Sequence, residues 1–270
     1  MKPPAERTTT SVRSASWYLD TVVARQKAET FLSLVKRWRD PKTAGPTLKT
    51  DLFEEANGED ALMPGLGGGV PLVGLDLDLD TARRARRRFA GANFVVVVTD
   101  MRKLGVRNST FELVVSPSTL DHFGTLEELE TALREIHRVL RPGGTAIFIF
   151  DNPSNPLYHA LRWVAPLVAP FPLGRTLGCR RLSKNLEALG FDVLGHDYVI
   201  HNPRGILTLI NLLLRFVLGR FAERPISVLV RAFAVLDRLP TRSWSACFVA
   251  VGARKRTPTA TARHEAATVR

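Results

Sequence analysis

Residues 72–89 read LVGLDLDLDTARRARRRF and join a short apolar run to a cluster of arginines. The first part, LVGLDL, has the length of a buried strand and ends in acidic residues. Asp80 and Thr81 are residue types that begin helices, so we expect a helix over residues 82–89. A strand followed by a short turn and a helix is the repeating unit of a parallel α/β sheet.

Further units of this kind follow along the chain. FVVVV at 94–98 contains five consecutive β-formers without alternation, which predicts a strand buried on both faces. FELVV at 111–115 and TAIFIF at 145–150 predict two more strands. Between them, Thr125 and Glu128 have the spacing of a capping box at the start of an amphipathic helix. We therefore expect an α/β fold with a Rossmann-like, doubly wound, mostly parallel sheet and flanking helices.

The outer parts of the chain are divided by composition and helical spacing. Apolar residues from Trp17 to Trp38 predict a helix in an N-terminal extension. We expect this tail and extension over residues 1–45, the main domain over 46–253 and a disordered basic tail over 254–270.

Two apolar inserts, at about 152–178 and 203–240, are expected to form helical lids at the edge of the sheet. Within the second insert, Pro225 is expected to divide residues 206–239 into two helices.

Composition limits the setting and the partners. The formal charge is +12, which favours contact with polyanions, but part of it lies in the C-terminal tail, and nucleic acid is not an expected partner. The five arginines between Arg83 and Arg88 are interpreted as a solvated face. Two cysteines, Cys179 and Cys247, fit a reducing cytoplasm, and the N-terminus has no secretory pattern, so a cytoplasmic location is expected.

Polar residues stand where successive strands are expected to end. They are Asp76, Asp100, Ser116 and Asp151. One such residue is common in turns, but several in successive units are more specific. Because ligands of open parallel sheets bind at the carboxyl ends of the strands, these residues predict a cleft that accepts hydrogen bonds from a ribose and an adenine.

Four consecutive motifs resemble the central part of class I S-adenosylmethionine-dependent methyltransferases. They are VGLDLDLDTARRARRRF, FVVVVTDMRKL, STFELVVSPSTLDHF and LREIHRVLRPGGTAIFIF, in the family's order and spacing. The similarity is greatest to the small-molecule branch that includes ubiquinone and menaquinone biosynthesis enzymes.

The resemblance assigns cofactor-binding roles. It implies that Asp76 accepts the ribose hydroxyls and that Leu77 touches the adenine. It further implies that Asp100 accepts the adenine amino group, Met101 packs on the ring and Ser116 lies near the methionine part. Helix capping or turn formation is the alternative interpretation of both aspartates.

The first motif departs from the family pattern. Asp51 lies 25 positions before Asp76, close to the family spacing, so it is expected to end the first strand and to bind the cofactor. LFEEANG then occupies the position of the family's glycine-rich loop, with Phe53 and Glu55 near glycine positions. Side chains there limit backbone approach, and the carboxylates require compensation by Lys49 or by a residue of the N-terminal helix.

His122 is the candidate catalytic base, because imidazole titrates near neutral pH and this residue follows the fourth strand. A purely structural role in the loop is the competing interpretation. His159 and Tyr158 lie in the first lid and are lower-ranked candidates for lining the acceptor site. No metal site is predicted.

The predicted function is methyl transfer from S-adenosylmethionine to a small, lipophilic acceptor. Two alternatives remain: a non-catalytic binding protein with the same fold, suggested by the LFEEANG loop, and an RNA methyltransferase, suggested by the positive charge. The apolar inserts with their arginines also suit contact with a membrane surface or with a second copy of the chain.

Overall fold

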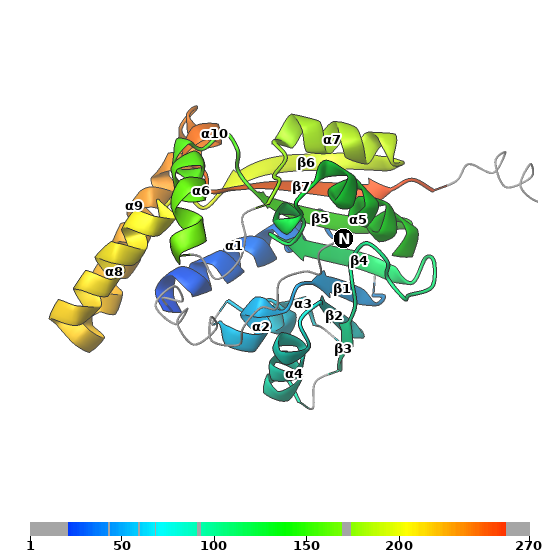
Figure 1. Ribbon diagram of the computed structural model, residues 1–270, viewed down its shortest axis with the longest axis horizontal. Helices are drawn as coiled ribbons and strands as arrows, with labels where there is room; N and C mark the ends of the chain where they lie inside the picture. The colour runs from blue at the N-terminus through cyan, green and yellow to red at the C-terminus, as the bar shows by residue number, and fades with distance from the viewer. Residues whose placement is uncertain are drawn as a thin grey trace, which may run out of the picture.

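The fold centres on one seven-stranded sheet. The structure is a computed structural model and describes residues 21–42, 44–58, 60–67, 69–90, 93–168 and 174–257. In this part of the chain the strand order is β3-β2-β1-β4-β5-β7-β6 (Figure 1). The strands are β1 Thr47–Thr50, β2 Leu72–Asp76, β3 Phe94–Val98, β4 Phe111–Pro117, β5 Leu140–Asp151, β6 Phe191–Val199 and β7 Phe248–Lys255. Neighbours from β3 to β5 are parallel, and β7 is antiparallel to β5 and β6. The predicted Rossmann-like, mostly parallel sheet is confirmed.

Helices cover both faces of the sheet. Alternate side chains of β4 point to opposite faces: Val114 belongs to one buried cluster, and Leu113 and Val115 belong to another. The first cluster is closed by α5 (Leu126–Val139) and α7 (Cys179–Ala188), and the second by α1 (Thr21–Trp38), α3 (Met63–Leu66) and α4 (Leu79–Arg88). This arrangement is a three-layer sandwich with the sheet in the middle.

Helix α1 lies on the main domain, as predicted for the N-terminal extension. The ring of Phe31 packs edge-on against Phe248 of β7, with 5.4 Å between ring centroids. A Cβ atom on Gly252 would overlap the Trp38 ring, so glycine is what allows the helix to lie this close to β7. Residues 17–20 of the predicted helix lie outside the described residues.

The predicted helical inserts follow β5 and β6 at the carboxyl end of the parallel strands. They contain α6 (Pro156–Val168), α8 (Arg204–Leu218) and α9 (Glu223–Ala234). Together with α10 (Arg242–Ser245), just after the second insert, these helices gather beyond one end of the sheet (Figure 1). Among the described residues, no helix has the combination of length and apolar character needed to cross a bilayer.

The division of the second insert differs from the prediction. The break between α8 and α9 falls at Gly219, whose φ is +53°, and at the 3₁₀ turn Gly219–Ala222. Pro225 instead lies in the first turn of α9. There its missing N–H removes no helical hydrogen bond, so proline does not end the helix.

Strand β3 is not buried on both faces, contrary to the prediction. Val95 is 52% exposed and Val98 is also exposed. The reason is that β3 is the edge strand of the sheet and pairs only with β2 among the described residues. A run of valines reports strand propensity and does not distinguish an edge from the centre.

Two helix starts show how well capping signals predict boundaries. The capping box of Thr125 and Glu128 is formed as predicted. Helix α4, however, begins earlier than predicted, because Asp78 and not Asp80 accepts the hydrogen bond from the Thr81 N–H, at 2.8 Å.

Strand β7 extends two residues beyond the domain end expected at residue 253. Lys255 is fixed there because its Nζ donates to the carbonyls of His137 and Leu140, at 2.6 and 2.8 Å. Arg256 donates to Asp192. The tail prediction is therefore wrong for residues 254–257, and residues 258–270 lie outside the described residues.

Candidate functional site

The ends of β1 and β2 bring two predicted cofactor-binding acids together. The backbone N–H of Leu52, next to Asp51, donates to Asp76 Oδ2 at 2.9 Å, and the N–H of Asp78 donates to Asp76 Oδ1 at 2.8 Å. These bonds fix the orientation of the Asp76 carboxylate. Burial, opposed by these hydrogen bonds, raises the pKa of Asp76.

Asp51 stands in a tight turn directly after β1. Its φ is +68°, a left-handed conformation that aspartate tolerates better than most residues, and its Oδ1 accepts the Phe53 N–H at 2.7 Å. Burial and repulsion by Glu54 and Asp76 raise the pKa of Asp51 to about 7, against the attraction of Lys49. Asp51 is therefore a carboxyl group that titrates near neutral pH.

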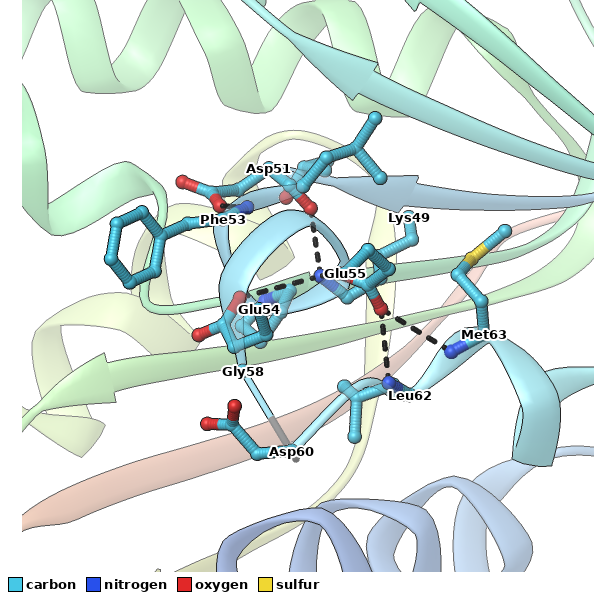
Figure 2. A network of polar contacts seen from close by, with 12 residues as sticks. Lys49, Asp51, Phe53, Glu54, Glu55, Gly58, Asp60, Leu62 and Met63 are labelled. Carbon is cyan, nitrogen blue, oxygen red and sulfur yellow. Dashed lines mark hydrogen bonds and ion pairs between the residues drawn. The ribbon is translucent and has the colours of Figure 1, made fainter. Parts of the chain in front are cut away.

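The position of the family's glycine loop is occupied by the helix α2 (Phe53–Asn57) and a buried ion pair. Lys49 Nζ lies 2.6 Å from Glu55 Oε2, and neither side chain is exposed (Figure 2). Lys49 also donates to the Asp51 carbonyl at 2.7 Å, while Glu55 Oε1 accepts the N–H groups of Leu62 and Met63. Glu55 is thus directed into the protein and joins β1 to the start of α3.

A second lysine compensates the remaining acids. Lys27 of α1 lies 2.8 Å from Glu54 and 2.9 Å from Asp60. Burial alone would raise the pKa of Glu54, but Lys27 and Lys49 lower it to about 2. Compensation of these carboxylates by Lys49 and by the N-terminal helix is confirmed, and it ties α1 to the loop after β1.

At the end of β3, Asp100 is already engaged by its neighbour. Arg102 contacts both carboxylate oxygens of Asp100 and also pairs with Glu128. The hydrogen bonds from Arg102 are the main reason that the pKa of Asp100 is lowered. Met101 is buried. An adenine amino group would have to share Asp100 with this guanidinium.

The other two assigned positions differ in exposure. Leu77, beside Asp76, is 71% exposed, which leaves an apolar surface open next to the carboxylate. Ser116 is buried, and its hydroxyl accepts a hydrogen bond from Thr50 Oγ1 at 3.0 Å. Thr50 also lies 2.8 Å from Thr119 Oγ1, so three hydroxyls meet between the ends of β1 and β4.

The turn after β4 carries the candidate base. His122 ends the 3₁₀ turn Leu120–His122 and is partly exposed. The N–H of Gly174 donates to the Asp121 carbonyl, so the chain that leads into α7 lies over this turn. His159, the other histidine considered, has its Nε2 2.9 Å from the Pro153 carbonyl.

Asp121 was missed by the sequence analysis. Its buried Oδ2 accepts from Ser118 Oγ and from the Asp151 N–H, whereas its Oδ1 has no hydrogen-bond partner among the described residues. Burial, followed by the negative charges of Asp151 and Asp121, raises the pKa of Tyr158 to about 12. A neutral phenol and two acids therefore lie near one another beside the candidate base. The only sequence signal was the polar run SPSTLDH.

Sequence comparison matches the centre of the chain to methyltransferases. The family described as "Methyltransferase domain" matches residues 58–148, which leaves out β1 and α2. An uncharacterized protein of Methanocaldococcus jannaschii is 32% identical over 119 residues, 41% of this chain and 42% of that protein. The ubiquinone/menaquinone biosynthesis C-methyltransferase UbiE of Desulfotalea psychrophila is 29% identical over 108 residues, 39% of this chain and 42% of that protein. The aligned region thus spans less than half the length of these curated relatives.

Solved structures share the fold over most of the chain. The [4+2]-cyclase SpnF has a TM-score of 0.56 and 16% identity, over 85% of this chain and 81% of that one. Haemonchus contortus phosphoethanolamine N-methyltransferase 2, solved with phosphomonomethylethanolamine and S-adenosylhomocysteine, has a TM-score of 0.57 and 15% identity, over 87% and 57%. At these identities the likeness concerns the fold.

The strand order, the strand-end acids and these matches define a class I methyltransferase fold. Residues 58–148 match a methyltransferase domain, and S-adenosylmethionine is the cofactor that methyltransferases of this class use.

Proposed function

We propose that the chain transfers a methyl group from S-adenosylmethionine to a small, lipophilic acceptor. The observation that carries this proposal is the contact between the ends of β1 and β2, where the Leu52 N–H holds the carboxylate of Asp76 next to Asp51. In an open parallel sheet this edge is where ligands bind.

The nucleoside end of the cofactor fits the residues present. Each oxygen of Asp76 accepts one backbone N–H and has a second lone pair for a ribose hydroxyl. The exposed Leu77 offers an apolar surface to the adenine. Asp100 would accept the adenine amino group beside Arg102.

The methionine part of the cofactor is matched by the charged side chains after β1. Asp51 is partly exposed and would pair with the cofactor's ammonium group once it is ionised. Repulsion between Glu55 and the carboxylate of the cofactor is reduced, because the charge of Glu55 is compensated by Lys49. The loop therefore supports binding by side-chain charge, where glycine loops use close backbone approach.

When bound, the cofactor supplies a methyl group on a sulfonium, which is already activated for transfer. The chain's own residues then orient the acceptor and exclude water from it. His122 takes a proton on an imidazole nitrogen from acceptors that must lose one. Ser116, held by Thr50, lines the floor of the site.

A lipophilic acceptor is supported by the surroundings of the site. Leu157 and Trp163 of α6 are exposed, and Trp163 is 86% exposed. Helix α6 leaves the carboxyl end of β5, the same edge at which Asp51 and Asp76 stand. Apolar side chains at this edge suit an acceptor that avoids water.

Calorimetric titration with S-adenosylhomocysteine tests the proposal. We expect the wild-type chain to bind, Asp76→Ala to lose measurable binding, and Asp80→Ala, a nearby exposed acid, to bind like the wild type. Urea denaturation of all three chains checks that folding is retained. Incubation with labelled S-adenosylmethionine and lipophilic metabolite extracts should then transfer label to an extractable product.

Each outcome distinguishes the alternatives. A wild-type chain that binds no S-adenosylhomocysteine up to millimolar concentration contradicts the enzyme and favours a binding protein. Wild-type affinity in Asp76→Ala shows that the pocket lies elsewhere. Label transferred to RNA, and not to small molecules, contradicts the acceptor class.

A further inference from the structure

Among the described residues, the hairpin of α8 and α9 has an apolar face that no other part of the chain covers. On its inner side, α8 buries Leu207, which packs in a small cluster with Ile226 and Val230 of α9. On the outer side, Leu209 is 68% exposed and Phe216 is 89% exposed. An ordinary surface helix places polar residues on this side.

The exposed apolar side chains follow the helical repeat. On α8 they recur at three- and four-residue intervals, which places them on one stripe along the helix. The members are Leu209, Leu212, Leu213, Phe216 and Val217, continued by Phe221 in the following turn. Trp163 of α6 and Trp244 of α10 are also exposed, and all four helices gather beyond one end of the sheet (Figure 1). Exposed apolar side chains that share one stripe of a helix mark a contact site.

The hairpin is also rich in arginine. Residues 204–242 contain seven arginines and two acids. On α9 and the turn after it, Arg224, Arg231 and Arg238 are seven residues apart and exposed, next to the exposed Val228 and Val235. Seven residues are close to two helical turns, so these guanidinium groups form a row along the helix.

The row is available to an anionic partner. Within the described part of the chain, Arg224, Arg231 and Arg238 form no ion pair. Of the two acids in the hairpin, Asp237 lies 3.5 Å from His201 Nε2, and Glu223 is exposed. The positive charge of the hairpin therefore suits a partner that supplies negative charge across a broad surface.

We propose that the α8–α9 hairpin docks this chain on an anionic lipid bilayer, lying in the plane of the interface. The leucines and Phe216 of α8 enter the boundary between headgroups and acyl chains, and the arginines of α9 contact lipid phosphates. A second copy fits less well, because a self-complementary contact would bring arginine rows together with few acids to neutralise them. RNA would use the arginines but would leave the apolar stripe in water.

Docking is independent of methyl transfer, but it deepens the proposed function. Because α8 follows β6 at the carboxyl end of the strands, a docked hairpin would turn the site's edge toward the bilayer. A lipophilic acceptor would then reach the site from the membrane. Vesicle binding can be measured without cofactor or acceptor, so failure of docking and failure of catalysis are separate results.

Sedimentation of the full chain with vesicles measures docking. Vesicles of phosphatidylcholine are compared with vesicles in which part of it is replaced by phosphatidylglycerol. We expect binding to the anionic vesicles that weakens with added salt and with loss of the anionic lipid. Leu213→Ser/Phe216→Ser should abolish it, while the exposed control pair Val95→Ser/Leu194→Ser should bind like the wild type.

Two triple arginine variants test whether vesicle binding depends on the arginine row of α9 or only on the total charge of the chain. Arg224→Gln/Arg231→Gln/Arg238→Gln should bind about a hundredfold more weakly, at roughly fivefold for each arginine near the surface. Arg83→Gln/Arg87→Gln/Arg134→Gln removes the same charge from α4 and α5 and should bind nearly as well as the wild type. The proposal is overturned if both triple variants lose the same amount of vesicle affinity, or if the wild-type chain does not bind vesicles. If vesicle binding is absent and light scattering detects a dimer that Leu213→Ser/Phe216→Ser dissociates, the apolar stripe is a contact between two copies of the chain.

Discussion

Lys49 and Glu55 form a fully buried ion pair at 2.6 Å in the position where related enzymes have a glycine-rich loop. Burial alone would lower the pKa of Lys49, but the carboxylates of Glu55, Glu54 and Asp51 outweigh it and raise the pKa above its ordinary value. Lys49 therefore remains charged inside the protein. Where a glycine-rich loop would give a flexible backbone, this pair fixes charged side chains around the end of β1.

Removing the lysine should destabilise the fold strongly. In Lys49→Met the carboxylate of Glu55 stays buried without its partner, so we expect a loss of about 3–5 kcal/mol in the free energy of unfolding. Urea denaturation measures it. Lys49→Met/Glu55→Leu should recover much of this loss, because no buried charge remains. Lys36→Met, at an exposed position of α1, serves as the control. A loss below about 1 kcal/mol in Lys49→Met would show that water reaches the pair.

Asp51 should make stability depend on pH. Its pKa is raised from 3.8 to about 7 by burial and by its acidic neighbours, so between these values the folded chain holds a proton that the unfolded chain has lost. Stability from this group therefore falls as pH rises through this window. Asp51→Asn should flatten the slope and be about 2 kcal/mol more stable than the wild type at alkaline pH, after allowance for solvent screening.

Thermal unfolding of the wild type and of Asp51→Asn, measured between about pH 4 and about pH 7, compares how their stability depends on pH. Glu54 acts in a different window: its pKa is lowered from 4.5 to about 2, so its contribution is lost only as pH falls through that lower range. If stability changes with pH to the same extent in the wild type and in Asp51→Asn, Asp51 is not the group responsible.

Cofactor binding should strengthen with pH for the same reason. If Asp51 pairs with the ammonium group, it must be ionised, and ionisation of a group with a pKa of about 7 rises severalfold between about pH 6 and about pH 7.5. The affinity for S-adenosylhomocysteine should rise by a similar factor. Calorimetry in buffers of different ionisation enthalpy should detect proton release. An unchanged profile in Asp51→Asn would assign the pH dependence to another group.

Arg102 should compete with the adenine for Asp100. Arg102→Gln removes the guanidinium that contacts both carboxylate oxygens, so we expect S-adenosylhomocysteine to bind severalfold more tightly. Asp100→Asn should weaken binding instead. The Kd of each variant for S-adenosylhomocysteine, measured by calorimetry, tests both expectations. Equal weakening in both variants would mean that Arg102 is needed to position the acid.

His122 should affect turnover without affecting the cofactor. For an acceptor that loses a proton, His122→Asn is expected to lower kcat by about 10²–10⁴-fold while the Kd for S-adenosylhomocysteine stays constant. A wild-type rate in His122→Asn would leave the histidine with a structural role.

Local sequence patterns predicted much of the architecture. Strand runs, capping residues and glycines act over a few residues, which is why the parallel sheet and the capping box at Thr125 were predicted correctly. Errors arose where neighbours far along the chain decide the outcome. The valines of β3 look central but lie at an edge, and Pro225 lies in the first turn of a helix that Gly219 separates from the one before.

The sequence alone determined the class of fold and the acids that end its strands, because Asp76 and Asp100 follow local strand patterns and Asp51 has the spacing from Asp76 that the family resemblance implies. It also showed that the glycine loop was absent. Only the tertiary structure decided how the charges of that loop are neutralised. Lys27 reaches Glu54 across 27 positions, and Arg102 reaches Glu128 across 26, and such pairings depend on how helices pack on the sheet. The exposed stripe of α8 was likewise decided by packing, because the sequence predicted an apolar helical insert and the contact with α9 buries only one side of that helix.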